Sequence, residues 1–294
     1  MKNLWVSPLT NCRNNLFLLF SFLLFTALLA VSASAAPTTG LRVALYAPDG
    51  TTVLNETFVS IAWMEQNLPV QGDGMTHYYH QGPVFVDDKE GQWDPEETAN
   101  FKDMGAVKGT AVRDLCDLVG GVAPGDEVMV KATDGYHVEF FRGNIYEPAP
   151  RQGNITLCWY NGEESSVGER QGTGYPPSYN VGMRLVFFAD NSTNSAGKHV
   201  FGNQDMRAVM PAETIHLFDD LYPSTSGYTV KWVDEVRVYQ DGYQGSSDIL
   251  PKSYESKIDE TYPAPPTSAG TGTSLPFVAL TIIGGALLLM RCGK

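Results

Sequence analysis

The sequence predicts a mixed α+β domain with mainly antiparallel strands, carried between an export signal and a membrane anchor. Short segments that alternate apolar and polar residues recur through the middle of the chain, which is typical of strands. Turn residues such as Asp-Gly and Asn-Gly separate these segments, and strands joined by such turns pair in antiparallel fashion. One further segment has the apolar spacing of an amphipathic helix, so we expect an α+β fold.

Residues 1–36 have the plan of a signal peptide. Lys2 and Arg13 precede an apolar run over residues 16–31, and small residues follow up to Pro37. This arrangement favours export and cleavage, and an uncleaved anchor helix is the alternative.

The C-terminal end predicts a membrane anchor on a stalk. Residues 244–274 are rich in Pro, Gly and Ser, and sixteen uncharged, mostly apolar residues follow at 275–290 before the basic end at Arg291. A membrane-spanning helix needs about 20 residues, with a lower limit of about 17. Residues 275–294 therefore form either a C-terminal transmembrane helix or a sorting tail that is removed. The basic end places the ectodomain outside the cell.

The charge of the chain excludes some partners. All 33 acidic residues and only 16 of the 20 basic ones lie between the two ends, so the ectodomain carries a formal charge near −17. Such a surface repels nucleic acid and anionic lipid, and we expect no nucleic-acid partner.

The first part of the ectodomain, residues 37–104, is predicted to be an N-terminal β extension. Strands at 41–46 and 53–61 flank a turn at Asp49 and form a hairpin. Residues 69–93 are rich in Gly and aromatic residues, which predicts an ordered loop rather than a linker.

Residues 105–243 are predicted to be the main domain. Apolar residues at helical spacing over 111–119 predict a helix. The two consecutive glycines that begin at Gly120 are predicted to end it. Further strands are predicted at 127–132, 155–160, 183–188 and 229–239.

Two kinds of residue between the two ends bear on export. Cys116 lies in the predicted helix and Cys158 in a predicted strand, so they either pair in an oxidising compartment or remain free and buried. Asn55, Asn154 and Asn191 stand in N-x-S/T sequons and are candidates for glycosylation.

A succession of short phrases then suggests a family. The phrases are KGTAVRDL at 108–115, DGY at 134–136, LCWYNGE at 157–163, GMRLV at 182–186 and VKWV at 230–233. In this order they resemble the molybdopterin-binding domain of the sulfite oxidase family of oxidoreductases. The resemblance implies that fold, and a pocket formed by Asp134, Tyr136, Arg184 and Lys231.

The chain departs from the family at the metal. Catalytic members hold molybdenum through a Cys thiolate ahead of the helix, because a soft sulfur ligand suits this metal. No Cys lies between Pro37 and Leu115. The resemblance therefore implies a domain that keeps the pocket and lacks the metal, with molybdopterin as the alternative cofactor.

Two sets of side chains remain as candidate sites. His77 and His80 would share a metal on a helical turn but point to opposite sides of a strand. Arg184 lies in an apolar strand, and a buried Arg needs an anion, which is either a carboxylate such as Asp134 or a bound ligand.

Three functions are consistent with these observations. The first is a membrane-anchored extracytoplasmic module that binds a small anionic ligand or an envelope protein. The second is an extracytoplasmic molybdopterin-dependent oxidoreductase. The third is a structural component of the cell envelope. The sequence favours the first, because the thiolate is missing while a stalk and an anchor are present.

Overall fold

The computed structural model describes residues 38–190 and 197–245. The predicted signal peptide, the stalk beyond residue 245, the C-terminal tail and the Asn191 sequon lie outside these residues. Within them, no helix is both long and apolar enough to cross a membrane.

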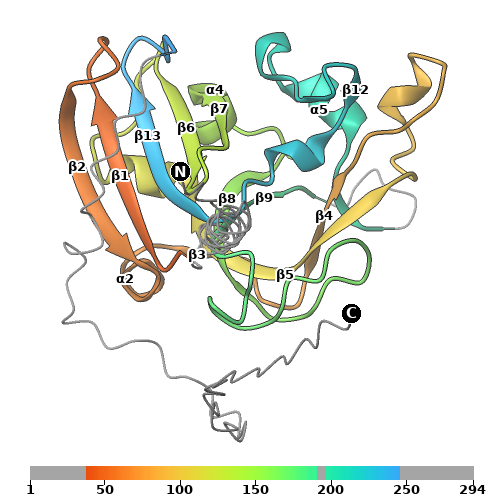
Figure 1. The fold of residues 1–294 in the computed structure, drawn as a ribbon, viewed down its shortest axis with the longest axis horizontal. Helices are drawn as coiled ribbons and strands as arrows, with labels where there is room; N and C mark the ends of the chain where they lie inside the picture. Colours follow the sequence, from red (N-terminus) through yellow and green to blue (C-terminus); the bar gives the residue numbers. More distant parts are fainter. Residues whose placement is uncertain (1–37, 191–196, 246–294) are drawn as a thin grey trace, which may run out of the picture.

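One sheet joins the two ends of the described chain. Its strands, in spatial order, are β2 (Val53–Ser60), β1 (Gly40–Tyr46), β13 (Val233–Tyr239), β6 (Glu127–Ala132) and β7 (His137–Phe141). β1 pairs with β13 in parallel, and the other pairs are antiparallel. This sheet occupies the left of Figure 1. The predicted hairpin of β1 and β2 exists, but it forms an edge of this sheet rather than an extension.

A second sheet contains the longest strand. Its path is β10 (His199–Phe201), β4 (His77–Gln81), β5 (Phe101–Ala111), β8 (Asn154–Asn161) and β9 (Arg184–Phe188), and β3 (Val70–Gln71) also pairs with β5. Among the described strands of this second sheet, β10 and β4 pair in parallel and the other pairs are antiparallel. The predicted loop at 69–93 was therefore partly wrong, since it contains β3 and β4. The predicted domain boundary at residue 104 falls inside β5.

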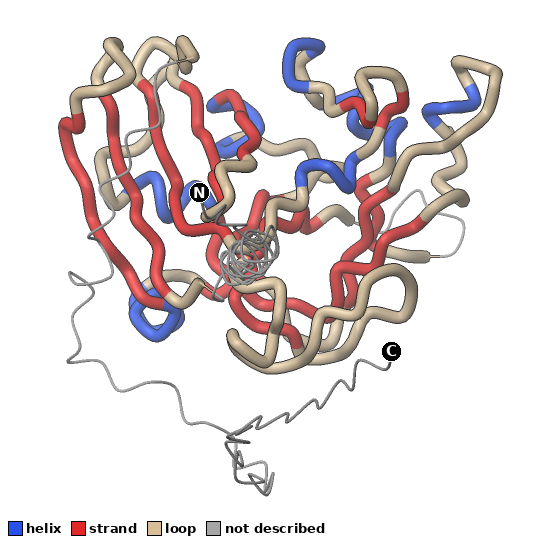
Figure 2. Tube along the Cα trace, viewed as in Figure 1, coloured by secondary structure: helices blue, strands red, loops and turns tan. Residues whose placement is uncertain are grey.

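The helices are short and lie between or beside the strands (Figure 2). They are α2 (Ile61–Asn67), α3 (Val112–Asp117), α4 (Arg142–Tyr146) and α5 (Asn203–Val209), with 3-10 turns η1 (Gly91–Trp93), η2 (Ala212–Thr214) and η3 (Thr225–Tyr228). A small hairpin of β11 (Leu217–Phe218) and β12 (Tyr222–Pro223) completes the fold. The mixed, sheet-rich α+β class predicted from the sequence is confirmed at this level.

Helix α3 ends where the sequence predicts. Gly120 and Gly121 both have positive φ angles, +120° and +78°, and the Gly121 N–H donates to the Cys116 carbonyl at 3.0 Å. Left-handed backbone at a helix end favours Gly because it lacks a Cβ. This stop turns the chain toward β6.

The main core lies between the two sheets. In β6, Val128 and Val130 belong to this core, whereas Met129 packs with Ala44 and Tyr239 on the opposite face. Such alternation follows from the two-residue period of a strand. The largest core side chains from the second sheet are Trp159, Phe187 and Phe201, which are fully buried.

Cys116 and Cys158 are free and completely buried. Cys116 lies in α3 and Cys158 in β8, so of the two possibilities open from the sequence, the structure shows two free apolar thiols. Burial raises the pKa of both thiols, which keeps them protonated and unreactive.

Candidate functional site

A cavity of about 560 Å³ opens where the two sheets meet. Its walls come from the start of β5, the end of β6, the segment between β8 and β9, the first residue of β9, and the chain between η3 and β13. All four pocket residues expected from the sequence line it, namely Asp134, Tyr136, Arg184 and Lys231. They do not play equal parts.

Arg184 lines the cavity and is buried, since only 5 % of its surface is exposed. One terminal guanidinium nitrogen donates to Gln171 Oε1 at 2.7 Å and the other to Thr229 Oγ1 at 2.9 Å. Nε has no hydrogen-bond partner among the residues that the structure describes. No carboxylate of the described residues forms an ion pair with it, so the expected alternative of pairing with Asp134 is wrong. Burial lowers the pKa of the guanidinium, although it remains a cation.

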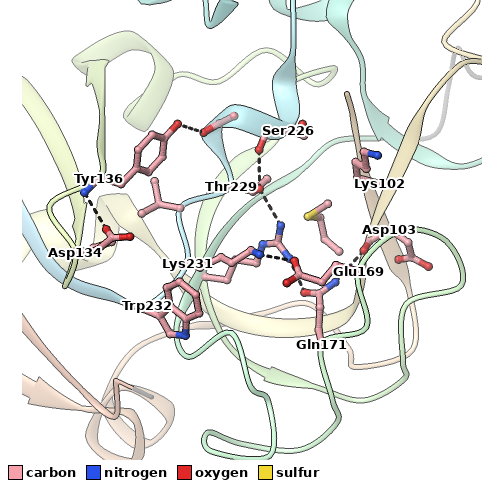
Figure 3. A pocket seen from close by; sticks show the side chains of 16 residues that line it. Lys102, Asp103, Asp134, Tyr136, Glu169, Gln171, Ser226, Thr229, Lys231 and Trp232 are labelled. Atoms are coloured by element: carbon pink, nitrogen blue, oxygen red, sulfur yellow. Dashed lines mark hydrogen bonds and ion pairs between the residues drawn. The ribbon is translucent and has the colours of Figure 1, made fainter. Parts of the chain in front are cut away.

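Two lysines add positive charge around Arg184. Lys231 pairs with Glu169 across the cavity mouth, and this pair is drawn in Figure 3. Lys102 lines the opposite side, and no ion pair joins it to a carboxylate in the described part of the chain. The carboxylate of Glu169 is near enough to favour the charged form of Arg184 but is committed to Lys231.

The wall between η3 and β13 is held in a strained conformation. Trp232 has a φ of +50°, which is rare for a bulky side chain. The backbone N–H of Trp232 donates to the Val181 carbonyl at 2.9 Å, and its backbone carbonyl accepts from the Thr133 N–H at 3.1 Å. These bonds tie the wall to the segment before β9 and to the turn after β6, and Trp232 lines the cavity. Strained backbone of this kind concentrates at functional sites.

Asp134 and Tyr136 lie on the rim rather than at the floor. The Asp134 carboxylate accepts from the Tyr136 N–H at 2.9 Å, which closes the turn between β6 and β7. The Tyr136 hydroxyl donates to the Gly227 carbonyl at 2.7 Å and lies 3.3 Å from His216 Nε2. The turn is therefore fastened to the opposite wall of the cavity mouth, as Figure 3 shows.

The segment between β8 and β9 is tied to β5 through Asp103. The carboxylate of Asp103 accepts from the N–H and the hydroxyl of Ser166 at 2.7 and 2.6 Å. The Gln171 side chain donates to the Asp103 carbonyl at 2.9 Å and accepts from Arg184. Gln171 is thus fixed from both sides, and it holds the guanidinium in one orientation.

His77 and His80 have different partners in the structure. His77 Nδ1 lies 3.0 Å from the Asp103 carboxylate, whereas His80 is fully buried between the Thr225 carbonyl and the Phe187 N–H. Partial burial opposes protonation of His77, but the carboxylates of Asp103 and Glu163 outweigh it and raise its pKa. Burial lowers the pKa of His80 to about 3. In the described residues, no three metal-ligating side chains cluster.

The donor set of the cavity does not fit a metal held by a thiolate. Among the residues described, the lining contains no Cys and no His, and Cys158 is buried in the adjacent β8 with its sulfur near the Thr156 carbonyl. Molybdenum bound in the manner of the sulfite oxidase family needs such a sulfur ligand. The cavity offers guanidinium, ammonium, amide and hydroxyl groups, which suit an organic or inorganic anion. Its lining also contains three carboxylates, and each has a partner within the chain: Asp103 accepts from Ser166, Asp134 accepts from the Tyr136 N–H, and Glu169 pairs with Lys231.

The two sequons that the structure describes differ in accessibility. Asn55 lies on the exposed edge strand β2, and its amide donates to the Val119 carbonyl at 3.1 Å. Asn154 begins β8, is half-buried, and its amide donates to Gln71 at 3.1 Å. Of the two, Asn55 presents the more open surface for a glycan.

Sequence reasoning missed several residues that shape the site. Lys102, Glu169, Gln171 and Thr229 all contribute to it, and none was singled out. One signal was present, since the segment 162–183 between two paired strands is far longer than a hairpin turn and is rich in Gly and polar residues. Such long connections often carry function.

No protein-family model matches the chain, and no curated protein sequence matches it either.

Proposed function

We propose that this chain is an exported, membrane-anchored module that binds a small organic or inorganic anion in the cavity, with Arg184 as the anchoring cation. The observation that carries the proposal is the buried guanidinium, which within residues 38–190 and 197–245 has an unpartnered Nε and no carboxylate in ion-pair contact. A buried charge costs several kcal/mol when it is not compensated, and an anionic ligand would compensate it.

The surroundings support an anion rather than a cation. Lys102 and Lys231 flank the entrance, and the carboxylate of Asp103 is engaged by Ser166 and His77. The cavity is therefore much less negative than the ectodomain as a whole. Its volume of about 560 Å³ lies within the range of about 300–1,000 Å³ that is usual for small-molecule sites.

The apolar lining indicates that the ligand has more than a charged group. Met104, Val230 and Trp232 line the cavity together with the polar residues. A ligand with an anionic end at Arg184 and an apolar or planar body against Trp232 would use both kinds of surface. The alternative of a molybdopterin-dependent oxidoreductase has less support, because the lining offers no sulfur ligand.

The test is thermal unfolding of the purified full chain with a panel of anions, namely phosphate, sulfate, citrate and benzoate. An anion at 100 times its Kd stabilises the folded state by about 2.7 kcal/mol. For a domain of this size, that shift corresponds to roughly 5–10 °C in Tm. We expect at least one anion to produce such a shift in the wild type and none to do so in Arg184→Met.

Arg113→Met is the matched control, because Arg113 is a partly exposed arginine outside the cavity, paired with Asp114. It should respond to anions as the wild type does. The proposal is wrong if no anion shifts the wild type, or if Arg184→Met keeps the shift. Stoichiometric molybdenum or a fluorescent pterin released from the denatured wild type would favour the oxidoreductase instead.

A further inference from the structure

A second surface, distinct from the cavity, exposes large apolar side chains. It is formed by Phe85, Val86, Leu217, Phe218 and Leu221, which are between 39 and 64 % exposed. We name these five residues the apolar patch. Single exposed apolar residues are ordinary on protein surfaces, but contiguous groups mark interaction sites.

The members of the apolar patch come from two segments that pack together. The ring of Phe85 lies 6.1 Å from that of Phe218 and 4.9 Å from that of Tyr222, both in edge-to-face geometry. Phe85 belongs to the loop between β4 and η1, and the other two belong to the small hairpin of β11 and β12. Figure 1 shows β12 beside this loop, at the upper right of the molecule.

The hairpin is anchored at its base, so the patch is preformed. The His216 N–H donates to the Tyr228 hydroxyl at 3.1 Å, and the Ser224 N–H donates to the His216 carbonyl at 3.1 Å. Tyr228 is buried in the main core. A partner would therefore meet an ordered surface, which lowers the entropic cost of association.

The tip of the hairpin has a conformation that its residues do not favour. Asp219 and Asp220 both have positive φ angles, +50° and +55°. Asn-Gly is the usual choice for such a turn, because a Cβ makes this conformation costly. Two consecutive aspartates in this conformation lower the stability of the turn. They also place negative charge between Phe218 and Leu221.

The charge around the apolar patch is mainly negative. Asp87 and Asp88 follow Val86 directly, and both are exposed. The two aspartates of the turn are exposed as well. Within residues 84–90, Lys89 is the single basic residue. An apolar centre with an acidic rim complements a surface with an apolar centre and a basic rim.

We propose that the apolar patch is a docking site for a protein partner whose surface has an apolar centre ringed by Lys and Arg. A second copy of this chain would oppose acidic rim to acidic rim, and nucleic acid or an anionic membrane would meet like charge. The patch lies outside the cavity lining, so the docking site does not depend on the ligand.

The test uses two synthetic peptides and the full chain. One peptide has a Phe-Leu-Phe-Leu centre with two lysines on each side, and the other has glutamates in place of the lysines. Fluorescence anisotropy should show that the lysine peptide binds at least tenfold more tightly, and that its Kd rises as salt is increased from 50 to 500 mM. Equal affinities for the two peptides would overturn the proposal.

Variants locate the binding. Leu221→Ser should weaken the binding of the lysine peptide about tenfold, because the substitution removes apolar surface that the peptide would bury. Met75→Ser is the control, since Met75 is 69 % exposed and lies outside the patch, and it should change nothing. Equal loss in both variants would overturn the proposal.

Two further measurements separate charge and membrane effects. Asp219→Asn with Asp220→Asn keeps residues that tolerate positive φ and removes two charges, so it should weaken only the lysine peptide. Binding of the full chain to neutral phosphatidylcholine vesicles that is lost in Leu221→Ser would assign the patch to a membrane and overturn the proposal.

Discussion

A buried arginine without a carboxylate partner reduces the stability of the empty protein, and the residues that surround Arg184 only partly offset this. Gln171 and Thr229 accept two of its hydrogen bonds, and its Nε has no partner in the described part of the chain. Replacing such a cation with an apolar side chain of similar length removes the desolvation cost together with the bonds. This cost is the reason for the proposal that Arg184 serves to bind a ligand rather than to stabilise the fold.

This argument makes a prediction about two substitutions of Arg184. Arg184→Met should change the free energy of unfolding by no more than about 1 kcal/mol, because the lost bonds and the removed charge offset each other. Arg184→Lys should destabilise the chain more, because an ammonium group keeps the buried charge but cannot reach both acceptors with a planar fork. Urea unfolding of both variants measures the difference, and the reverse order would contradict the argument.

His80 makes a second prediction at the scale of a single residue. Burial lowers its pKa in the folded chain to about 3, whereas an unfolded His has a pKa of about 6.5. The unfolded state therefore binds an extra proton between these values, and stability falls as the pH is lowered from 6.5 toward 3. This residue alone contributes up to about 1.4 kcal/mol per pH unit.

The measurement is the free energy of unfolding against pH for the wild type and His80→Gln. The wild type should lose more stability than the variant on acidification below pH 6.5, and the two curves should be parallel above pH 7.5. Parallel curves over the whole range would show that His80 is not held neutral in the folded state.

At the scale of elements, the pairing of β5 with β8 depends on one glycine. A Cβ on Gly109 would lie 2.3 Å from the Leu157 carbonyl oxygen and 2.7 Å from the Cys158 Cα, which are both backbone atoms. The register between the strands shifts at this point. Because β5 also supplies Lys102 and Asp103, a distortion here would reach the cavity.

We predict that Gly109→Ala lowers the free energy of unfolding by about 2–3 kcal/mol, since overpacking against backbone cannot relax through a rotamer change. Gly143→Ala is the control, because nothing lies within 4 Å of its added Cβ and Gly143 is in α4. It should be neutral or stabilise the chain by up to about 1 kcal/mol. Thermal and urea unfolding measure the stability of both variants. Equal changes in the two variants would contradict the prediction for Gly109.

The elements also show which strands and helices local sequence patterns can predict. Local periods with turn signals beside them predicted six of the strands and the helix α3, namely β1, β2, β6, β8, β9 and β13. β13 begins at Val233 rather than at residue 229. β4 was missed because its sequence, HYYHQ, is polar in type although three of its residues are buried. β5 was missed because Gly105 and Gly109 interrupt its apolar pattern.

Long-range pairing and most of the site were beyond local patterns. The parallel pairing of β1 with β13 joins opposite ends of the described chain, and no local period contains that information. Arg184 was identified because a charge in an apolar strand is unusual. Gln171 and Glu169 are ordinary polar residues in a loop, and only the fold shows that they meet Arg184 and Lys231.

At the scale of the whole molecule, the excess of acidic residues acts on folding as well as on partners. Residues 37–274 carry a formal charge near −17, with 33 acidic residues against 16 basic ones. Like charges repel more strongly in the compact state than in the extended chain, so this excess opposes folding at low ionic strength. Salt screens the repulsion over a Debye length of about 10 Å at 0.1 M.

We therefore predict that Tm rises as NaCl is increased from 20 to 500 mM at pH 7.5. Surface ion pairs such as Arg207 with Glu90 would weaken in the same range, but exposed pairs contribute little, and the summed repulsion should dominate. Tetramethylammonium chloride should act like NaCl if the effect is screening, since this bulky cation does not bind carboxylates closely. A Tm that falls with both salts would mean that attractive pairs outweigh the repulsion, and that the acidic surface does not limit the stability of this fold.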